Sequence, residues 1–109
     1  MKEPCVYMLA SRRDGVLYIG VTGSLADRMA EHDQGLVPGF TKRYGVRLLV
    51  YYEMHDSFDD AIRRETQLKK WKRAWKVRLI EKPEWLNLFD PSTGEILFGP
   101  ADLARTAQR

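Results

Sequence analysis

The segment CVYMLASRRDGVLYIGVTGSLADRMAEH, residues 5–32, contains four side chains that could act together on an anionic substrate. Tyr7 and Tyr18 carry phenols, which can orient or deprotonate a water molecule, and His32 carries an imidazole that can exchange protons. Arg28 carries a guanidinium, whose paired donors match the oxygens of a phosphate. Whether these residues form one site or are ordinary core and surface positions depends on the elements that hold them.

A second feature is a carboxylate inside an apolar helical pattern. Six residues at steps of three and four predict one core-facing stripe on a helix over residues 58–80: Ile62, Glu65, Leu68, Trp71, Trp75 and Leu79. Ser57 with Asp60 supplies its N-cap. A carboxylate on the core side of a helix is costly unless it is paired or binds a cation. An ion pair between Glu65 and Arg28 is therefore one interpretation, and a bound cation is the other.

A β-hairpin is expected to position the two tyrosines. Residues 4–11 and 16–21 are short apolar segments, and Asp14 followed by Gly15 between them is a strong hairpin signal. In a hairpin with an even-numbered loop, directly opposed residues have numbers that sum to an odd value, and opposed side chains share a face. Tyr7 and Tyr18 should therefore point to the same side of the sheet.

The arginine and the histidine fall on a predicted helix. Ser24 with Asp27 three residues later is typical of a helix start, and Gly35 of a helix end. Arg28 and His32 are four residues apart, so they should be neighbours on one helical face.

The rest of the chain offers one more strand and a tail. Residues 36–45 are expected to form a loop, and residues 46–54 a third strand whose long apolar run predicts a central position in the sheet. In the segment from residue 82 onward, which prolines interrupt, we expect only packing roles for Trp85 and Leu88.

Composition limits the class of protein. With 109 residues, 44% hydrophobic and 30% charged, the chain is expected to be one globular domain. It has neither a long apolar run nor the layout of a signal peptide, so we expect a cytoplasmic protein without a membrane partner. Its single cysteine, Cys5, cannot form an internal disulfide and is expected to be a packed thiol. The net charge of +3 is mild, but basic residues crowd positions 63–78 and would attract polyanions.

Five blocks of this sequence resemble the GIY-YIG nuclease superfamily, specifically its small standalone bacterial members. They are CVYMLA, LYIGVT, SLADRMAEH, TKRYGVRLLVYYE and AIRRETQLKKWKRAWKVRLI. The resemblance implies a compact α/β (α+β) domain over residues 1–88, with a three-stranded antiparallel sheet flanked by helices. Residues 89–109 would then be a C-terminal tail.

The resemblance also implies a reaction, the hydrolysis of a nucleic-acid phosphodiester with one divalent ion, Mg²⁺ or Mn²⁺. By position, the catalytic residues would be Tyr7, Tyr18, Arg28, His32 and Glu65, with Glu65 as the metal ligand and Gly20 closing the second motif. Lys42 matches a residue common in the standalone group, and we expect it to contact nucleic acid together with Lys69, Lys72 and Lys76. Cys5 and Val6 replace the first two residues of the first motif, which we interpret as a packing change.

Three functions remain in competition. The first is a metal-dependent endonuclease or nicking enzyme acting on DNA, in repair or recombination, with other repair proteins as partners. The second is a nucleic-acid-binding module with weak or no activity. The third is a basic amphipathic helix for a protein or an anionic membrane, which leaves Glu65 unexplained. For the enzyme, we expect Tyr7, Tyr18, Arg28, His32 and Glu65 to converge on one concave, solvent-reachable face.

Overall fold

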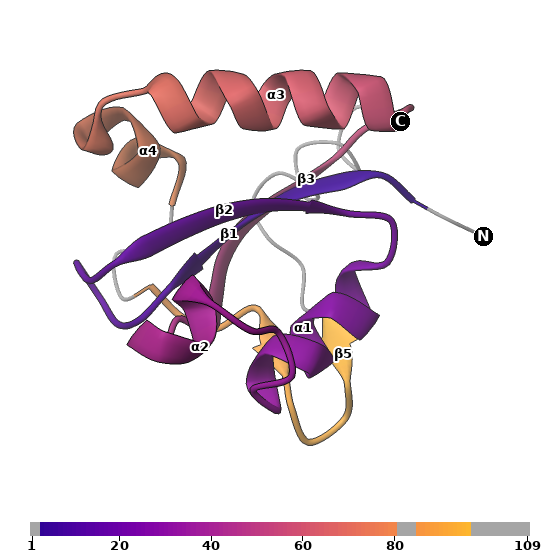
Figure 1. The fold of residues 1–109 in the computed structure, drawn as a ribbon, viewed down its shortest axis with the longest axis vertical. Coiled ribbons are helices and arrows are strands. Elements are labelled where there is room, and N and C mark those ends of the chain that lie inside the picture. The colour runs from indigo at the N-terminus through magenta and orange to yellow at the C-terminus, as the bar shows by residue number, and fades with distance from the viewer. Residues whose placement is uncertain (1–2, 81–84, 97–109) are drawn as a thin grey trace.

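The structure, a computed structural model, describes residues 3–80 and 85–96. A three-stranded antiparallel sheet lies between α3 on one side and α1 with α2 on the other (Figure 1). The strands are β1 (Cys5–Ala10), β2 (Leu17–Thr22) and β3 (Leu48–Met54), in the order β2-β1-β3. The helices are α1 (Leu25–Asp33), α2 (Phe40–Tyr44), α3 (Phe58–Lys70) and α4 (Arg73–Leu79). The fold is α+β, as predicted.

The first hairpin has the predicted register. Tyr7 lies opposite Gly20 and Leu9 opposite Tyr18, so opposed numbers sum to an odd value. The turn is closed by the Gly15 amide, which donates to the Arg12 carbonyl at 2.9 Å. The two tyrosines therefore point to the same face of the sheet, and this prediction is confirmed.

The central strand β1 is fully buried, and it separates two apolar clusters. Cys5, Tyr7 and Leu9 belong to the cluster on the α1 side, and Cys5 is a packed thiol as expected. The alternate residues Val6, Met8 and Ala10 belong to the cluster on the α3 side, with Ala61 and Leu68 of α3. Each face of the sheet thus has its own core, because alternate strand residues point to opposite faces.

The predicted central position of the third strand is wrong, because β1 is the central strand and β3 lies at an edge. Its long apolar run has another cause. Residues of β3 contribute to both cores, since Leu49 belongs to the α1-side cluster and Val50 to the α3-side cluster, and residues 87 and 88 cover its outer edge. There the Leu88 amide donates to the Leu49 carbonyl at 2.8 Å, and Asn87 Oδ1 accepts from the Leu49 amide at 3.0 Å.

The single helix predicted over residues 58–80 is also wrong. Its N-cap is confirmed, since Ser57 Oγ accepts from the Asp60 amide at 3.1 Å. The helix ends at Lys70, however, because Trp71 leaves it in an extended conformation and packs against the α3-side cluster. The predicted core stripe is confirmed only in part. Leu68 is fully buried and Trp71 and Leu79 pack against the same cluster, whereas Ile62 is 50% exposed and Trp75 is 46% exposed.

The predicted loop at residues 36–45 contains the short helix α2. Gly39 and Gly45 flank α2 with φ of 97° and 63°, values that favour glycine, and the buried Thr41 anchors it to the domain. The loop prediction missed it because five residues give too short a pattern to distinguish from a turn.

Part of the expected C-terminal tail is ordered against the domain. β4 (Phe89–Asp90) and β5 (Glu95–Ile96) pair as a small sheet, and Phe89 is buried in the α1-side cluster. Trp85 and Leu88 are buried, as predicted. Residues 97–109 of the expected tail lie outside the described residues. Within the described chain, no helix has the length and apolar character needed to cross a membrane.

Candidate active site

Gly20 allows the two tyrosines to pack against β2. A Cβ at position 20 would lie 2.5 Å from Tyr7 Oη and 3.1 Å from Tyr18 Cε2, so any side chain there would displace the Tyr7 ring. With glycine in place, the ring centroids of Tyr7 and Tyr18 are 6.3 Å apart. The glycine that closes the second motif is thus required for close approach.

His32 completes a cluster of three rings with the tyrosines. Its ring centroid lies 5.9 Å from that of Tyr7 and 6.0 Å from that of Tyr18. His32 Nε2 is 3.3 Å from Tyr7 Oη, and the buried Nδ1 has no hydrogen-bond partner in the described structure. If Nε2 carries the ring proton, it donates to the phenol oxygen of Tyr7 and leaves the phenol proton available for another acceptor.

The local environment keeps this pair uncharged at neutral pH. Burial, and to a smaller extent Tyr18, raises the pKa of Tyr7, while the charge of Arg28 acts in the opposite direction. Burial, followed by the charge of Arg28, lowers the pKa of His32. Tyr7 is therefore a protonated phenol and His32 a neutral imidazole, so Tyr7 would not act as a base without help.

Arg28 lies one helical turn before His32 on α1, as the spacing predicts. Its guanidinium is partly exposed and forms an ion pair with Glu31 at 3.6 Å. Its place on α1 is one turn from His32, whose ring packs against both tyrosines. The arginine is therefore placed to offer donors to an anion bound beside the rings.

The prediction that all five residues converge on one concave, solvent-reachable face is wrong: Glu65 belongs to the opposite layer, and Tyr7 and His32 are buried at 2% and 4% exposure. Helix α3 covers the face of the sheet opposite to Tyr7 and Tyr18 (Figure 1). Glu65 pairs with Lys69, one turn further along α3, at 3.5 Å, and its side chain is 21% exposed. Burial is the main cause of the raised pKa of Tyr7, and the charge of Glu65 makes only a minor contribution.

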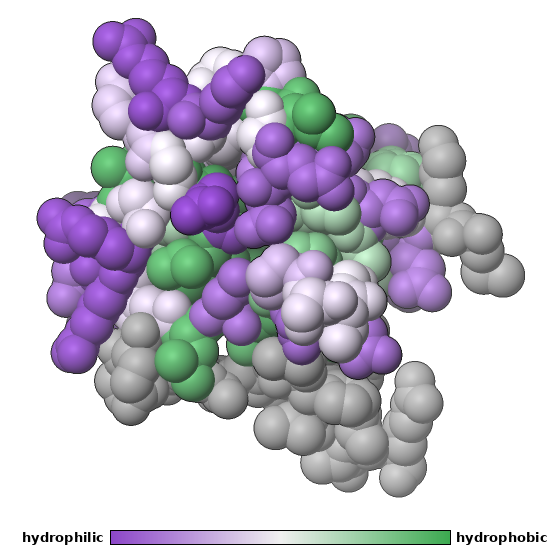
Figure 2. Space-filling view, turned by 90° about the horizontal axis from the view of Figure 1, so that it is seen from below, coloured by the Kyte–Doolittle hydropathy of each residue, from purple (hydrophilic) through white to green (hydrophobic). Residues whose placement is uncertain are grey.

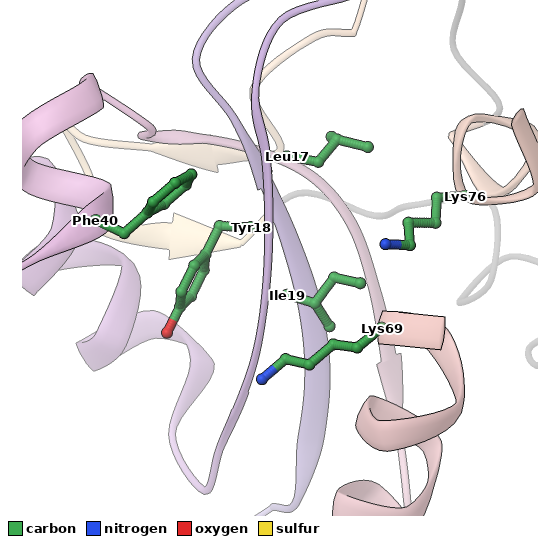
Figure 3. A pocket seen from close by; sticks show the side chains of 6 residues that line it. All are labelled: Leu17, Tyr18, Ile19, Phe40, Lys69 and Lys76. Carbon is green, nitrogen blue, oxygen red and sulfur yellow. The ribbon is translucent and has the colours of Figure 1, made fainter. Parts of the chain in front are cut away.

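The two layers meet in a groove at the edge strand β2. The groove has a volume of about 250 Å³ and is lined by Leu17, Tyr18, Ile19, Phe40, Lys69 and Lys76. Figure 3 shows that Tyr18 and Phe40 lie on one side of β2 and the two lysines on the other. Glu65 is the ion-pair partner of Lys69, but its own side chain is not among those that line the groove.

The other predicted nucleic-acid contacts are divided. Lys69 and Lys76 line the groove. Lys42 is exposed on α2, and Lys72 is the N-cap of α4, with its Nζ 6.0 Å from the ring centroid of Trp75.

The sequence predictions missed Phe40, whose ring stacks on that of Tyr18. The available signal was the pair Phe40 and Tyr44, two aromatic residues spaced four apart in a segment that glycines flank on both sides.

The donor set limits which ion could bind. Among residues 3–80 and 85–96, no group of three or more histidine, cysteine, aspartate or glutamate side chains could hold a metal. Glu65 offers a single, partly exposed carboxylate. This fits Mg²⁺ or Mn²⁺, because a hard ion of this kind can keep several water ligands and bind through one carboxylate together with substrate phosphate.

Comparison with known proteins assigns the chain to a family. The model of the GIY-YIG catalytic domain matches residues 3–78. The chain belongs to the GIY-YIG family. A UPF0213 protein of Staphylococcus haemolyticus is 35% identical over 75% of this chain and 99% of the relative. Another, from Syntrophus aciditrophicus, is 37% identical over 75% of this chain and 94% of the relative.

A solved structure is also similar. The solution NMR structure of a UPF0213 protein from Bacillus halodurans matches with a TM-score of 0.46 and 28% identity, over 75% of this chain and 86% of that chain. The GIY-YIG domain makes this chain a member of a nuclease family, with nucleic acid as the class of substrate. The name UPF0213 specifies no activity.

Proposed function

We propose that this chain is a divalent-metal-dependent endonuclease or nicking enzyme that hydrolyses DNA phosphodiester bonds. The observation that carries the proposal is the groove at β2, where Tyr18 of the ring cluster and Lys69, the ion-pair partner of Glu65, line the same space. The strand edge gives a phosphate access to both layers at once. A role in DNA repair or recombination, with repair proteins as partners, belongs to the same proposal.

Cations of the groove would bind the phosphate. Lys69 and Lys76 line the groove and supply ammonium groups on the α3 and α4 side. Arg28, on α1 one turn before His32, is outside the groove lining and would supply a guanidinium from the α1 side. A guanidinium can donate two parallel hydrogen bonds to non-bridging oxygens, which fixes the orientation of the phosphorus as well as its position. The positive charges and the oriented hydrogen bonds would both stabilise a pentacovalent transition state, because its negative charge exceeds that of the substrate.

Tyr18 and Tyr7 would have different roles. Tyr18 lines the groove, so a bound water can reach its hydroxyl, and we assign it the orientation of the attacking water. Tyr7 is buried and hydrogen-bonded to His32, and its raised pKa keeps it protonated. We assign Tyr7 and His32 the positioning of Tyr18, because both rings pack against it.

Glu65 would hold the ion with its carboxylate. A divalent ion bound there would supply positive charge to the phosphate and to the leaving oxygen. The Lys69 ammonium, which now neutralises the carboxylate at 3.5 Å, would be free to move to a phosphate oxygen.

The ion pair between Glu65 and Lys69 is also compatible with the second candidate function, a nucleic-acid-binding module without hydrolytic activity. In that case Glu65 would be a structural partner of Lys69, and the high pKa of Tyr7 would have no catalytic consequence. The lysines of the groove would still bind phosphates.

The substitution Glu65→Gln separates the two functions. It keeps the shape of the side chain and removes the charge, so cleavage of labelled DNA in Mn²⁺ should fall by at least about 100-fold. Binding to DNA without metal should persist or strengthen, because a negative charge near the phosphate is lost. Glu95→Gln, an exposed site on β5, is the matched control and should cleave like the wild type.

Two results would contradict the proposal. Cleavage that survives Glu65→Gln would remove Glu65 from metal binding. A wild-type protein that binds DNA but cleaves no form of it, whether single-stranded, duplex or branched, would favour the binding module.

A further inference from the structure

Helix α2 presents two exposed aromatic side chains at the entrance of the groove. Phe40 is 45% exposed and Tyr44, one turn later, is 49% exposed, with ring centroids 4.9 Å apart. The Phe40 ring lies nearly parallel to that of Tyr18, at 24° and 6.3 Å between centroids. Tyr18, Phe40 and Tyr44, here called the aromatic ladder, thus extend from the ring cluster to the surface.

Helix α2 is anchored to the domain by residues other than Phe40 and Tyr44. Thr41 supplies the buried contact of the helix, and Val46, just after it, is fully buried in the α1-side cluster. Phe40 and Tyr44 leave about half of their surface to solvent, which is unfavourable for large apolar rings. Exposed aromatic rings beside a binding groove are typical of a surface that meets a partner.

Positive charge accompanies the ladder. The Arg43 guanidinium lies 5.5 Å from the ring centroid of Tyr44, and Lys42 is exposed on the same helix. Lys69 and Lys76 lie across the groove from Phe40 (Figure 3). On the face that carries α1 and α2, hydrophobic residues lie in small groups among hydrophilic ones (Figure 2). Rings interleaved with cations match a strand of alternating bases and phosphates.

We propose that the aromatic ladder is a stacking platform for unpaired bases, so that this chain prefers a single-stranded or locally unpaired nucleic acid to a continuous duplex. Bases in a duplex are already stacked and their faces are not accessible, whereas unpaired bases can lie on Phe40 and Tyr44. The strand that crosses the ladder would place its phosphate in the groove at β2. This last point rests on the proposed function, but the stacking itself does not.

The competing explanation is that Phe40 merely shields Tyr18 from water. Shielding needs only apolar area, so leucine would serve almost as well as phenylalanine. Stacking needs a planar ring, so leucine would fail and tryptophan would serve at least as well. The two explanations therefore predict different outcomes for volume-preserving changes.

The experiment measures binding of labelled oligonucleotides in EDTA, where cleavage does not interfere. For the double variant Phe40→Leu/Tyr44→Leu, affinity for a 20-nucleotide oligothymidine should fall at least about fivefold, the smallest loss expected on removal of one stacking ring. Affinity for a blunt duplex of two separate strands, which has no unpaired loop, should change less than twofold. An abasic strand of the same length should bind wild type and variant equally, because it has phosphates but no bases.

Controls separate stacking from misfolding. Phe58→Leu removes an exposed phenylalanine at the start of α3 and should leave single-strand affinity unchanged. Phe40→Trp should bind oligothymidine as tightly as the wild type or more tightly, and thermal melting checks that each variant folds. An oligouridine of the same length tests whether the platform accepts RNA; stacking predicts that it does.

Equal losses on oligothymidine and duplex, or a loss no larger than that of Phe58→Leu, would overturn the proposal. The outcome is independent of hydrolysis. Single-strand binding that depends on the ladder in a protein that cleaves nothing would support the platform and refute the nuclease. If the protein cleaves DNA but the ladder variants bind oligothymidine as tightly as the wild type, the nuclease is supported and the platform is refuted.

Discussion

At the scale of single residues, the absence of a side chain at Gly20 lets the Tyr7 ring lie directly against β2. Tyr7 lies opposite Gly20, and its ring occupies the space where a side chain of β2 would be. Hairpin parity predicted from sequence that Tyr7 and Tyr18 share a face. It could not predict the contact with His32, because that depends on how α1 packs on the sheet rather than on any spacing along the chain.

Gly20→Ala should destabilise the fold by about 1–3 kcal/mol, the cost of overpacking a buried site. Without the clash the change would stabilise the strand, because alanine loses less backbone entropy than glycine on folding. The new Cβ, however, would lie 2.6 Å from Tyr7 Cζ. Urea denaturation measures the free energy of unfolding.

Making the same substitution in the Tyr7→Leu variant tests whether the Tyr7 ring causes that loss of stability. In Tyr7→Leu the ring is gone, so adding Gly20→Ala there should cost clearly less than it does in the wild type. The same cost in both backgrounds would show that the Tyr7 ring is not what excludes a side chain from position 20.

At the scale of elements, α3 is held over the sheet by a polar network on the side away from the groove. Arg64 Nε donates to Glu53 Oε1 of β3 at 2.8 Å, and His55 Nε2 lies 2.8 Å from the same oxygen. Burial raises the pKa of Glu53, but hydrogen bonds from Tyr51, Arg64 and His55 outweigh it and hold the pKa below its ordinary value. Because Glu65 follows Arg64, this network also fixes the position of the candidate metal ligand.

Arg64→Gln should therefore cost roughly 1.5–3 kcal/mol of stability, the range for a hydrogen bond to a charged group. The neighbouring Arg63→Gln is the control: its ion pair with Asp60 is exposed, with the Arg63 side chain at 79%, so the change should stay within about 0.5 kcal/mol. The Arg64 contribution depends on ionised Glu53, so it is present above the pKa of an unfolded glutamate, about 4.3, and is lost as the pH falls further. Chemical denaturation at pH 7 and pH 3.5 measures both effects. Equal losses for the two arginines would contradict a role for the network.

Element boundaries show what local sequence can and cannot predict. The N-cap of α3 and the hairpin turn were predictable, because Ser57 and the Asp14–Gly15 turn act through neighbouring residues. Ser24 is the N-cap of α1 by position, as predicted, but its hydroxyl donates to Asp27 Oδ2 and forms no capping hydrogen bond with the backbone. The end of α3 was not predictable, since no glycine or proline marks it. Trp71 leaves the helix to pack on the α3-side cluster, where the Arg64 guanidinium also lies 5.1 Å from its ring centroid. Tertiary packing of this kind overrides a continuous helical pattern.

At the scale of the whole molecule, the two edges of the sheet are used differently. The edge at β3 is covered by the segment around Asn87 and Leu88, which bonds to Leu49. The edge at β2 borders the groove, so residues from opposite layers approach the same space. No periodicity along the chain could indicate this, because Phe40 and Lys69 lie on α2 and α3, which cover opposite faces of the sheet.

The charge of the groove leads to a prediction about salt. If Lys69 and Lys76 each neutralise one phosphate of duplex DNA, replacing both with alanine should flatten the slope of log K against log [salt] by about 1.8, since each contact contributes about 0.9. Lys70→Ala/Arg78→Ala removes the same charge from exposed positions outside the groove lining and is the matched control. Fluorescence anisotropy between 50 and 200 mM salt, on the order of physiological ionic strength, gives the slopes. Because the long-range field of the protein changes equally in both variants, a slope that flattens only for the groove pair locates the bound phosphates at β2, and equal flattening would place them elsewhere on the basic surface.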